Sequence, residues 1–406
     1  DPKRGWDAYA GVDMTGKVAL VLSNDPDFEA GRDLGFDGRR MALAGRFGSK
    51  VEAAARAGAV AVLVIHEEAA ASYPFSQVGS GDALPQMVPV LAPAATMKAS
   101  GWLASGTAID LLRAAGLDLE ALKASARSSG FRAFALPAKL SFDGSLKATP
   151  ITSHNVIGRL AGASHPGETV LYGAHWDANG TNGPDARGDT IRNGAVDNAT
   201  GTAELLEIAR GFGRGPRPAR SIVVAAWTAE EKGLLGSDYY ARHPLYPLAK
   251  TALVINLDPH VVLPAARNLE LIGGGRTAVE ADLARVARGH GLRVDDEPSP
   301  EAGWYFRSDH YSFARLGVPA IAFRAGRDLV DGGTAAGNAL VAGYNRDRYH
   351  QPSDEFIPSW TFAGTLQEAT VAFVLGTEVA NSTTWPTWTA GSEYGAMRDA
   401  SAAERR

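Results

Sequence analysis

The sequence has 406 residues, of which 45% are hydrophobic, and its formal net charge is -5. This length suits one large domain or two ordinary ones with a sizeable core. The negative balance disfavours nucleic acid or an anionic membrane as a partner, because both favour a basic surface. The sequence holds no cysteine, so any metal must be bound by His, Asp or Glu. No apolar run approaches the roughly 20 residues of a membrane helix.

The first part of the chain predicts a small α/β domain over residues 1–135. Buried strands and a helix alternate in "GKVALVL", "KVEAAARAGA" and "VAVLVIH". The predicted elements, in chain order, are strand 16–22, helix 50–59, strand 60–66, strand 87–93 and helix 108–124. His66 stands alone at a strand end, so we expect it to be structural.

The second part of the chain predicts a larger domain over residues 136–385. A connector and a strand occupy residues 136–162, after which strands and helices alternate. The further predicted strands are 168–175, 220–231, 250–259, 268–274 and 318–326. The predicted helices are 201–212, 234–244, 278–291, 310–317 and 362–381. This alternation predicts an α/β fold with a mostly parallel, doubly wound sheet and helices on both faces.

A polar tail follows at residues 386–406, and we expect it to be irregular. Trp385 and Trp388 are interpreted as packing this tail onto the domain.

Polar side chains follow the strands of the second domain at the point where each strand ends. His175 and Asp177 follow "TVLYGA", Glu230 and Glu231 follow "SIVVAAWTA", and Asp258 follows "ALVINL". In such sheets, functional groups gather beyond the carboxyl ends of the strands. We therefore expect these side chains to share one site.

Asp197 in "NGAVDNATG" and His350 in "YHQPSD" complete a set of two histidines and five carboxylates. The set has no obvious lysine or arginine partner, so the carboxylates would repel one another without a cation. Two divalent metals would neutralise them, and imidazole and carboxylate ligands suit zinc, cobalt or manganese. Two ions about 3.5–4 Å apart would share a bridging carboxylate and a water, which makes hydroxide available to attack an amide carbonyl.

The adjacent residues Glu230 and Glu231 suit two different tasks. Neighbouring side chains on an extended segment point in different directions. One glutamate can therefore bind a metal, while the other acts as the general base that moves a proton from water to the leaving amine.

At this point the sequence resembles a known family, the co-catalytic zinc aminopeptidases. The segments that carry the resemblance are "GAHWD", "GAVDNATGTAELLEIAR", "AAWTAEEKGLLGS", "NLDPH", "SDHYSFARLGVPA" and "YHQPSDE". They span residues 153–380, and the clan also includes glutamate carboxypeptidase and the catalytically inactive transferrin receptor. Residues 16–93 resemble a protease-associated domain, an insertion of many secreted members. This resemblance implies a secreted or periplasmic protein that acts on peptides.

The resemblance implies a role for each of five metal-binding residues. His175 and Asp258 would hold the first of two zinc ions. Glu231 and His350 would hold the second, and Asp197 would bridge the two.

The resemblance also implies roles for residues around the ions. Glu230 would be the general base, and Asp177 would orient His175, as metal-bound histidines require. Asp309 and His310 match a family segment near the substrate pocket and would contact the substrate. Related chains usually carry catalytic-domain sequence before the insertion, and almost none precedes it here, so a helix of that domain is expected to be missing.

Four functions are compatible with the pattern, and the first is an aminopeptidase. A glutamate carboxypeptidase type of enzyme needs a cationic clamp on the substrate carboxylate, and Arg307 and Arg324 lie in suitable segments. A glutaminyl cyclase would use one zinc and lack the full ligand set. A non-catalytic receptor would have lost ligands. The oligomeric state is not predicted.

Overall fold

The computed structural model divides the chain into two compact units. Unit 1 comprises Asp1–Pro150 and Ser299–Phe306, and unit 2 comprises Ile151–Pro298 and Arg307–Arg406. The first boundary between them follows Pro150, whereas the sequence predicted a domain limit after residue 135. The residues that the structure describes are 1, 4–75, 78, 87–89, 97–143, 145 and 147–405.

Among its described residues, unit 1 contains a three-stranded parallel sheet in the order β1-β2-β3. The strands are β1 (Val18–Leu22), β2 (Ala61–His66) and β3 (Ala99–Ala104). Val62 and Val64 of β2 pack in one cluster with Ala54, while Ile65 packs in another with Leu112. The two faces of the sheet are therefore both covered, which explains why its strands are almost continuously apolar.

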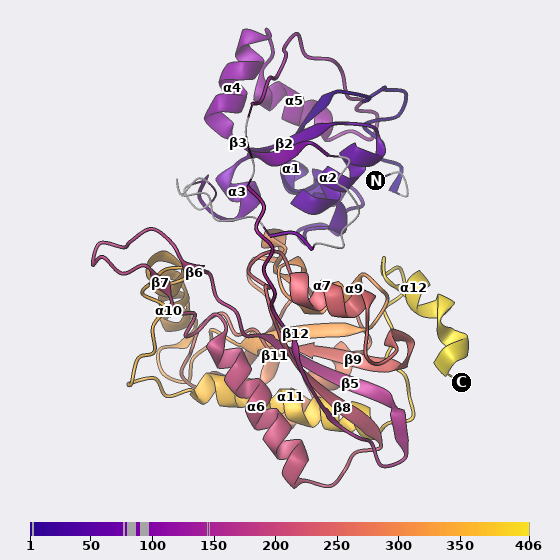
Figure 1. The fold of residues 1–406 in the computed structure, drawn as a ribbon, viewed down its shortest axis with the longest axis vertical. Helices are drawn as coiled ribbons and strands as arrows, with labels where there is room; N and C mark the ends of the chain where they lie inside the picture. The colour runs from indigo at the N-terminus through magenta and orange to yellow at the C-terminus, as the bar shows by residue number, and fades with distance from the viewer. Residues whose placement is uncertain are drawn as a thin grey trace. The chain divides into compact units, whose positions relative to one another are not determined.

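The helices of unit 1 surround this sheet (Figure 1). They are α1 (Pro26–Ala30), α2 (Phe47–Arg56), α3 (Glu68–Ala71), α4 (Ser105–Ala114) and α5 (Leu119–Ala126), with short 3-10 turns η2 (Leu43–Gly45), η5 (Pro300–Ala302) and η6 (Trp304–Phe306). The single helix predicted over residues 108–124 was wrong, because Gly116 takes a left-handed φ of 76° and separates α4 from α5. Such a φ is accessible to glycine at little cost.

The third strand of this sheet also differs from the prediction. Of the strand predicted at residues 87–93, residues 87–89 are not in a strand and the rest lies outside the described residues. β3 fills the third position instead, with the sequence "ASGWLA". Its small residues and glycine give little strand signal, because strand patterns depend on β-branched and aromatic side chains.

Unit 2 contains, among its described residues, a seven-stranded sheet in the order β11-β10-β12-β9-β5-β8-β4. Its strands are β4 (Val156–Leu160), β5 (His165–His175), β8 (Arg220–Trp227), β9 (Thr251–Asn256), β10 (Asn268–Leu271), β11 (Arg293–Asp296) and β12 (Ala320–Ala325). β4 pairs antiparallel with β8, and β10 pairs antiparallel with β12. The other described neighbours are parallel. The predicted mostly parallel α/β sheet is confirmed.

Helices cover both faces of this sheet (Figure 1). The helices of unit 2 are α6 (Ala199–Arg214), α7 (Leu235–Arg242), α8 (Val279–Gly289), α9 (His310–Ala314), α10 (Gly333–Asp347), α11 (Ala363–Asn381) and α12 (Gly395–Ala400), with 3-10 turns η4 (Leu248–Lys250) and η7 (Ala402–Arg405). α6, α8 and α11 share one core with the sheet, in which Leu205, Leu283 and Leu375 are buried. α7 and α9 pack on the other face, where Trp227 contacts Tyr240 and Phe313.

Three parts of unit 2 differ from the prediction. α10 and β11 were not predicted, because "GTAAGNALVAGYNRD" is rich in glycine and alanine and "RVDD" has one apolar residue. The tail after residue 385 was expected to be irregular, but it forms α12 and η7. Trp388 is buried and donates from Nε1 to the Gly317 carbonyl at 2.9 Å, and Trp385 packs against the main core. The tryptophans therefore pack the tail, as expected.

A two-stranded hairpin of β6 (Gly180–Thr181) and β7 (Ile191–Arg192) leads from β5 toward α6. None of the helices in the described residues combines the length and apolar content that crossing a membrane requires.

Candidate metal centre

Three neighbouring strands of the sheet end at the same level. β5 lies between β8 and β9, with His175 opposite Trp227 and Gly173 opposite Asn256. Both pairs run parallel, so the carboxyl ends of the three strands meet at one edge. The side chains that follow these strands are thereby brought together, as the sequence predicted.

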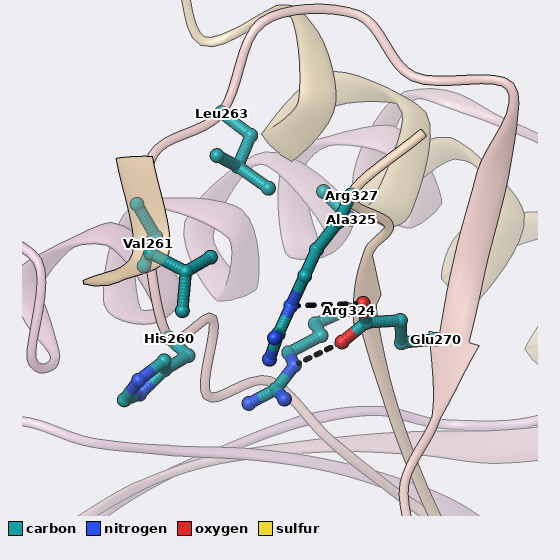
Figure 2. A pocket seen from close by; sticks show the side chains of 8 residues that line it. His260, Val261, Leu263, Glu270, Arg324, Ala325 and Arg327 are labelled. Atoms are coloured by element: carbon teal, nitrogen blue, oxygen red, sulfur yellow. Dashed lines mark hydrogen bonds and ion pairs between the residues drawn. The ribbon is translucent and has the colours of Figure 1, made fainter. Parts of the chain in front are cut away.

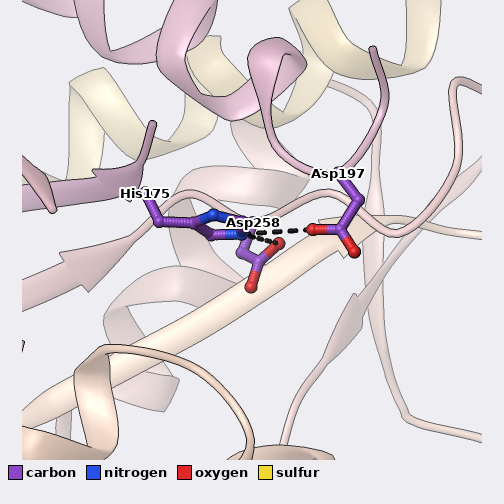
Figure 3. A group of neighbouring side chains, drawn as sticks. All are labelled: His175, Asp197 and Asp258. Carbon is purple, nitrogen blue, oxygen red and sulfur yellow. Dashed lines mark hydrogen bonds and ion pairs between the residues drawn. The ribbon is translucent and has the colours of Figure 1, made fainter. Parts of the chain in front are cut away.

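The first group of possible metal ligands is His175, Asp197 and Asp258 (Figure 3). His175 Nε2 lies 3.1 Å from Asp197 Oδ1 and 3.9 Å from Asp258 Oδ1. One donor atom from each residue lies within 4.8 Å of the others. Asp258 accepts from Ser308 Oγ at 2.5 Å, a contact that the sequence analysis did not anticipate.

The second group is Asp197, Glu231 and His350. His350 Nε2 lies 3.1 Å from Asp197 Oδ2 and 3.3 Å from Glu231 Oε2. Asp197 therefore belongs to both groups and turns a different oxygen toward each histidine. Glu230 belongs to neither group, and it is buried beside them.

The hydrogen bonding of His175 leaves one ring nitrogen suited to a cation. Nδ1 lies 3.0 Å from the backbone carbonyl of Asp177, which can only accept. In the neutral ring Nδ1 therefore carries the proton, and the lone pair of Nε2 faces Asp197 and Asp258. A backbone carbonyl in this role is a common partner of metal-bound histidines.

The carboxylate of Asp177 has a different set of partners. Its Oδ1 accepts from the Glu230 amide at 3.0 Å, and its Oδ2 accepts from the Glu231 amide at 3.3 Å. The distance from Oδ1 to His175 Nδ1 is 3.7 Å, too long for a good hydrogen bond. Asp177 thus contacts His175 through its carbonyl, while its carboxylate holds the backbone that carries both glutamates.

Asp197 lies on a short loop before α6 that is held from both sides. Asn198 caps α6, accepting from the Gly201 amide at 2.9 Å and donating to the Leu257 carbonyl at 3.0 Å. The peptide between Asp197 and Asn198 is cis. On the other side, Asp354 accepts from the amides of Val196 and Asp197. Asp354 was not predicted from the sequence, although it lies four residues after His350 in the segment "YHQPSD".

Burial and mutual repulsion disfavour ionisation of three carboxyl groups in this site, those of Glu230, Glu231 and Asp258. Burial raises the pKa of Glu231 to about 7, and the charge of Asp197 adds to that rise. Burial also raises the pKa of Glu230 well above its usual value; His175 opposes that rise, and the charges of Asp309 and Glu231 add to it. Burial raises the pKa of Asp258 as well. A cation among these groups would relieve both effects.

The donor set therefore fits a pair of divalent metal ions. It consists of nitrogen and oxygen donors without sulfur, and it divides into two clusters that share one carboxylate. Zinc takes imidazole and carboxylate ligands of this kind.

Asp309 and His310, predicted to contact the substrate, lie at the start of α9, and each is only 1% exposed. Burial raises the pKa of Asp309 to about 7. Their substrate contact stays a prediction. His260, which could have competed as a ligand, instead lies 2.6 Å from Asn345 Oδ1 through its Nε2.

A separate pocket of unit 2 contains two arginines that both contact the carboxylate of one glutamate (Figure 2). Glu270 Oε2 lies 3.2 Å from Arg324 Nε, and its Oε1 lies 3.1 Å from Arg327 Nε. The empty space in and in front of the pocket, part of it open solvent, is about 220 Å³. The lining residues are His260, Val261, Leu263, Glu270, Arg324, Ala325, Arg327 and Val341.

Comparisons with known families give two matches. The family model described as "Peptidase family M28" matches residues 155–374, which is more than half of the chain. The model described as "PA domain" matches residues 3–97. The first match contains every residue of the two ligand groups.

Individual proteins are similar over parts of the chain. Aminopeptidase NAALADL1 of Mus musculus is 42% identical over 113 residues, covering 26% of this chain and 14% of that protein. A probable zinc metalloprotease of Pyrenophora teres f. teres (strain 0-1) is 27% identical over 240 residues, covering 58% of this chain and 45% of that protein. The chain thus spans less than half the length of both relatives. The solved aminopeptidase from Aneurinibacillus sp. strain AM-1 is 22% identical, with a TM-score of 0.44, covering 91% of this chain and 70% of that one.

Proposed function

Because the chain belongs to peptidase family M28, we propose that it is a zinc-dependent exopeptidase that binds two zinc ions and removes N-terminal residues from peptides. The observation that carries the proposal is the shared carboxylate of Asp197, which faces His175 through one oxygen and His350 through the other. A bridging carboxylate is what two ions about 3.5–4 Å apart require. The names of the aminopeptidase and zinc metalloprotease relatives support the same activity.

Each residue of the site has a distinct part in this proposal. His175 and Asp258 hold one zinc, Glu231 and His350 hold the other, and Asp197 serves both. Zinc, when bound, polarises the scissile carbonyl and lowers the pKa of water.

Glu230 is the general base in this account. It is buried and lies outside both ligand groups, so its carboxylate is available to take a proton from the attacking water. Its pKa is raised above the usual value of a glutamate, the direction in which enzymes shift a carboxylate that takes up a proton and passes it on. Asp177 holds the backbone amides of Glu230 and Glu231, which aims the two side chains at different tasks.

A panel of blocked dipeptides tests the proposal. We expect the zinc-loaded chain to cleave dipeptides with a free amine, including those with an amidated carboxyl end, and to leave N-acetylated dipeptides intact. Chelation should abolish cleavage, and zinc should restore it. Cleavage that persists in chelator, or that requires a free carboxylate in place of a free amine, would contradict the proposed aminopeptidase.

The pocket with Arg324 and Arg327 favours a carboxypeptidase as the second candidate (Figure 2). Two guanidinium groups can bind a substrate carboxylate. Glu270 already contacts both of them, which leaves the two arginines and the glutamate with one net positive charge. Hydrolysis of N-acetylated dipeptides with a free carboxyl end would select this candidate.

Two other readings make different predictions about metal. A glutaminyl cyclase would bind one zinc per chain, and a receptor-like protein would have lost ligands. We favour neither, because both ligand groups are complete. Export from the cytoplasm, suggested by the PA domain match, remains a prediction.

A further inference from the structure

We propose that Asp354 is a positioning residue that fixes Asp197 against His350 and so sets the zinc affinity of the centre. It lies on the chain segment that follows His350, and it is buried, with 2% of its surface exposed. The inference rests on the proposed function, because it concerns the same metal centre.

The contacts of Asp354 reach directly to the loop that carries Asp197. Its Oδ2 accepts from the Val196 amide at 3.1 Å and from the Asp197 amide at 3.2 Å. Its own backbone carbonyl accepts from the Ala195 amide at 3.0 Å. Three successive amides of the Asp197 loop therefore bond to one residue of the His350 segment.

The position of Asp354 is itself held by its neighbours. Tyr344 donates its hydroxyl to Oδ2 at 3.3 Å, and the Arg348 guanidinium lies 3.8 Å from Oδ1. Arg348 also donates to the Glu355 carbonyl and lies over the Trp360 ring, with 5.1 Å between its Cζ and the ring centroid. These contacts hold the Asp354 carboxylate in the position from which it accepts from the Asp197 loop. The positive charge of Arg348 also offsets its buried negative charge.

Asp354 repeats an arrangement found on the opposite side of the site. Asp177 accepts from two successive amides, those of Glu230 and Glu231. Asp354 does the same for Val196 and Asp197. In each case a carboxylate from one loop, half-buried in Asp177 and buried in Asp354, holds the backbone of another loop that supplies ligands.

This arrangement has a consequence for metal affinity. The second ligand group takes Asp197 from one loop and His350 from another, and Asp354 joins the two. Without the carboxylate of Asp354, the amides of Val196 and Asp197 lose the side-chain acceptor that fixes them relative to His350, while the backbone carbonyl of residue 354 still accepts from Ala195. Partners of metal ligands typically change metal affinity 10–100-fold when they are removed, and we expect a loss of about tenfold or more for at least one of the two zinc ions.

The test compares Asp354→Asn and Asp354→Ala with wild type in two measurements. Zinc titration against a competing chelator gives the affinity of each ion. Hydrogen exchange of the metal-free protein gives the protection of the amides at residues 195–197. Asp347→Asn serves as the control, because it makes the same charge change at an exposed side chain that pairs with Arg346. We expect the control to match wild type.

The two measurements separate positioning from stability alone. We expect Asp354→Ala to bind zinc more weakly and to lose amide protection at residues 196 and 197, and Asp354→Asn to lose less of both, because its side-chain carbonyl oxygen can still accept. The amide of Ala195 should keep its protection, because it bonds to the backbone carbonyl of residue 354. Wild-type zinc affinity in Asp354→Ala, or wild-type protection of the Val196 and Asp197 amides in that variant without metal, would overturn the proposal even if the variant unfolds at lower temperature. If the wild-type chain binds no zinc, the proposed function is overturned, and the proposed role of Asp354 in zinc affinity is overturned as well.

Discussion

Asp197 is the one residue that belongs to both proposed zinc sites. Its Oδ1 lies 3.1 Å from His175 Nε2, and its Oδ2 lies 3.1 Å from His350 Nε2. These contacts outweigh the effect of burial and lower its pKa. Among the carboxyl groups of the two ligand groups, only Asp197 has surroundings that favour the charged form. A metal ligand needs this charged form.

Replacing Asp197 with alanine should remove both zinc ions, because one carboxylate serves both ligand groups. Elemental analysis after dialysis against zinc measures the outcome. Asp185→Ala, on the β6–β7 hairpin, is the control and should keep the wild-type zinc content. Unchanged stoichiometry in Asp197→Ala would count against bridging.

Replacing Glu230 with glutamine should leave zinc content unchanged and slow turnover by roughly 10²–10⁴-fold, the contribution typical of a general base. Glutamine keeps the size of the side chain but cannot take up the proton. Steady-state kinetics on a free dipeptide, alongside elemental analysis, measures both quantities. A kcat near that of wild type would remove Glu230 from the mechanism.

At the scale of elements, the beginning of α6 connects fold stability with the site. Asn198 caps the helix and bonds to the Leu257 carbonyl at the end of β9, one residue before Asp258. The same residue therefore holds a helix start and two ligand-bearing loops together.

Replacing Asn198 with alanine should lower the free energy of unfolding by about 0.5–2 kcal/mol, the usual value of a helix cap, and should also weaken zinc binding. Asp118→Ala removes the cap of α5 in unit 1, where Asp118 accepts from the Ala121 amide. We expect it to cost similar stability without changing zinc affinity. Denaturant unfolding measures the stability of both variants, and zinc titration measures their zinc affinity. Equal zinc affinities in Asn198→Ala and Asp118→Ala would refute the link between the α6 cap and the metal site.

A pair of buried glutamates on α6 and α11 should make stability depend on pH. Burial raises the pKa of Glu368 to about 8. Burial also raises the pKa of Glu204 well above its usual value, and the charge of Glu368 adds to that rise. A carboxyl group whose pKa is raised by folding binds its proton more tightly in the folded state. Stability is therefore lost as pH rises from the usual pKa of 4.5 to about 8.

Replacing Glu368 with glutamine should reduce the loss of stability at high pH, because glutamine does not ionise. Glutamine can still accept from the Ala325 amide, which Glu368 contacts at 3.0 Å. We expect its thermal midpoint to exceed that of wild type at pH 9 by about 2 °C or more, with the gap narrowing toward pH 5. Glu378→Gln on the same helix is the control, because Arg285 lowers the pKa of Glu378. If the difference in thermal midpoint between Glu368→Gln and wild type does not change with pH, Glu368 is not the source of the pH dependence.

The sequence predicted the elements of unit 2 that carry strong apolar patterns, and their ends identified most of the site. His175, Glu231 and Asp258 could be placed because each follows a buried parallel strand. β3, β11 and α10 could not, because small or charged residues leave no clear period. Asp354 was missed for another reason: its role lies in hydrogen bonds to backbone amides far away in the sequence, and no local pattern encodes those.

At the scale of the whole molecule, the candidate chemistry belongs to one of the two units. Both ligand groups, with Glu230, Asp177 and Asp354, lie within the residue ranges of unit 2. Unit 1 has its own sheet and cores. A ligand that binds only the folded state of unit 2 should therefore stabilise unit 2 by mass action.

Zinc removal should consequently affect the two units differently. We expect hydrogen exchange after chelation to increase at the ends of β5, β8 and β9 and around residues 195–198 and 348–354. The strands β1, β2 and β3 should keep their protection. Equal loss of protection in β1–β3 would contradict the assignment of the metal centre to unit 2.

The most direct measurement of the central claim is anomalous diffraction at the zinc edge from crystals of the zinc-loaded chain. The account predicts two peaks about 3.5–4 Å apart, one beside His175 and Asp258 and the other beside Glu231 and His350, with Asp197 touching both. A single peak, or peaks away from these side chains, would contradict it.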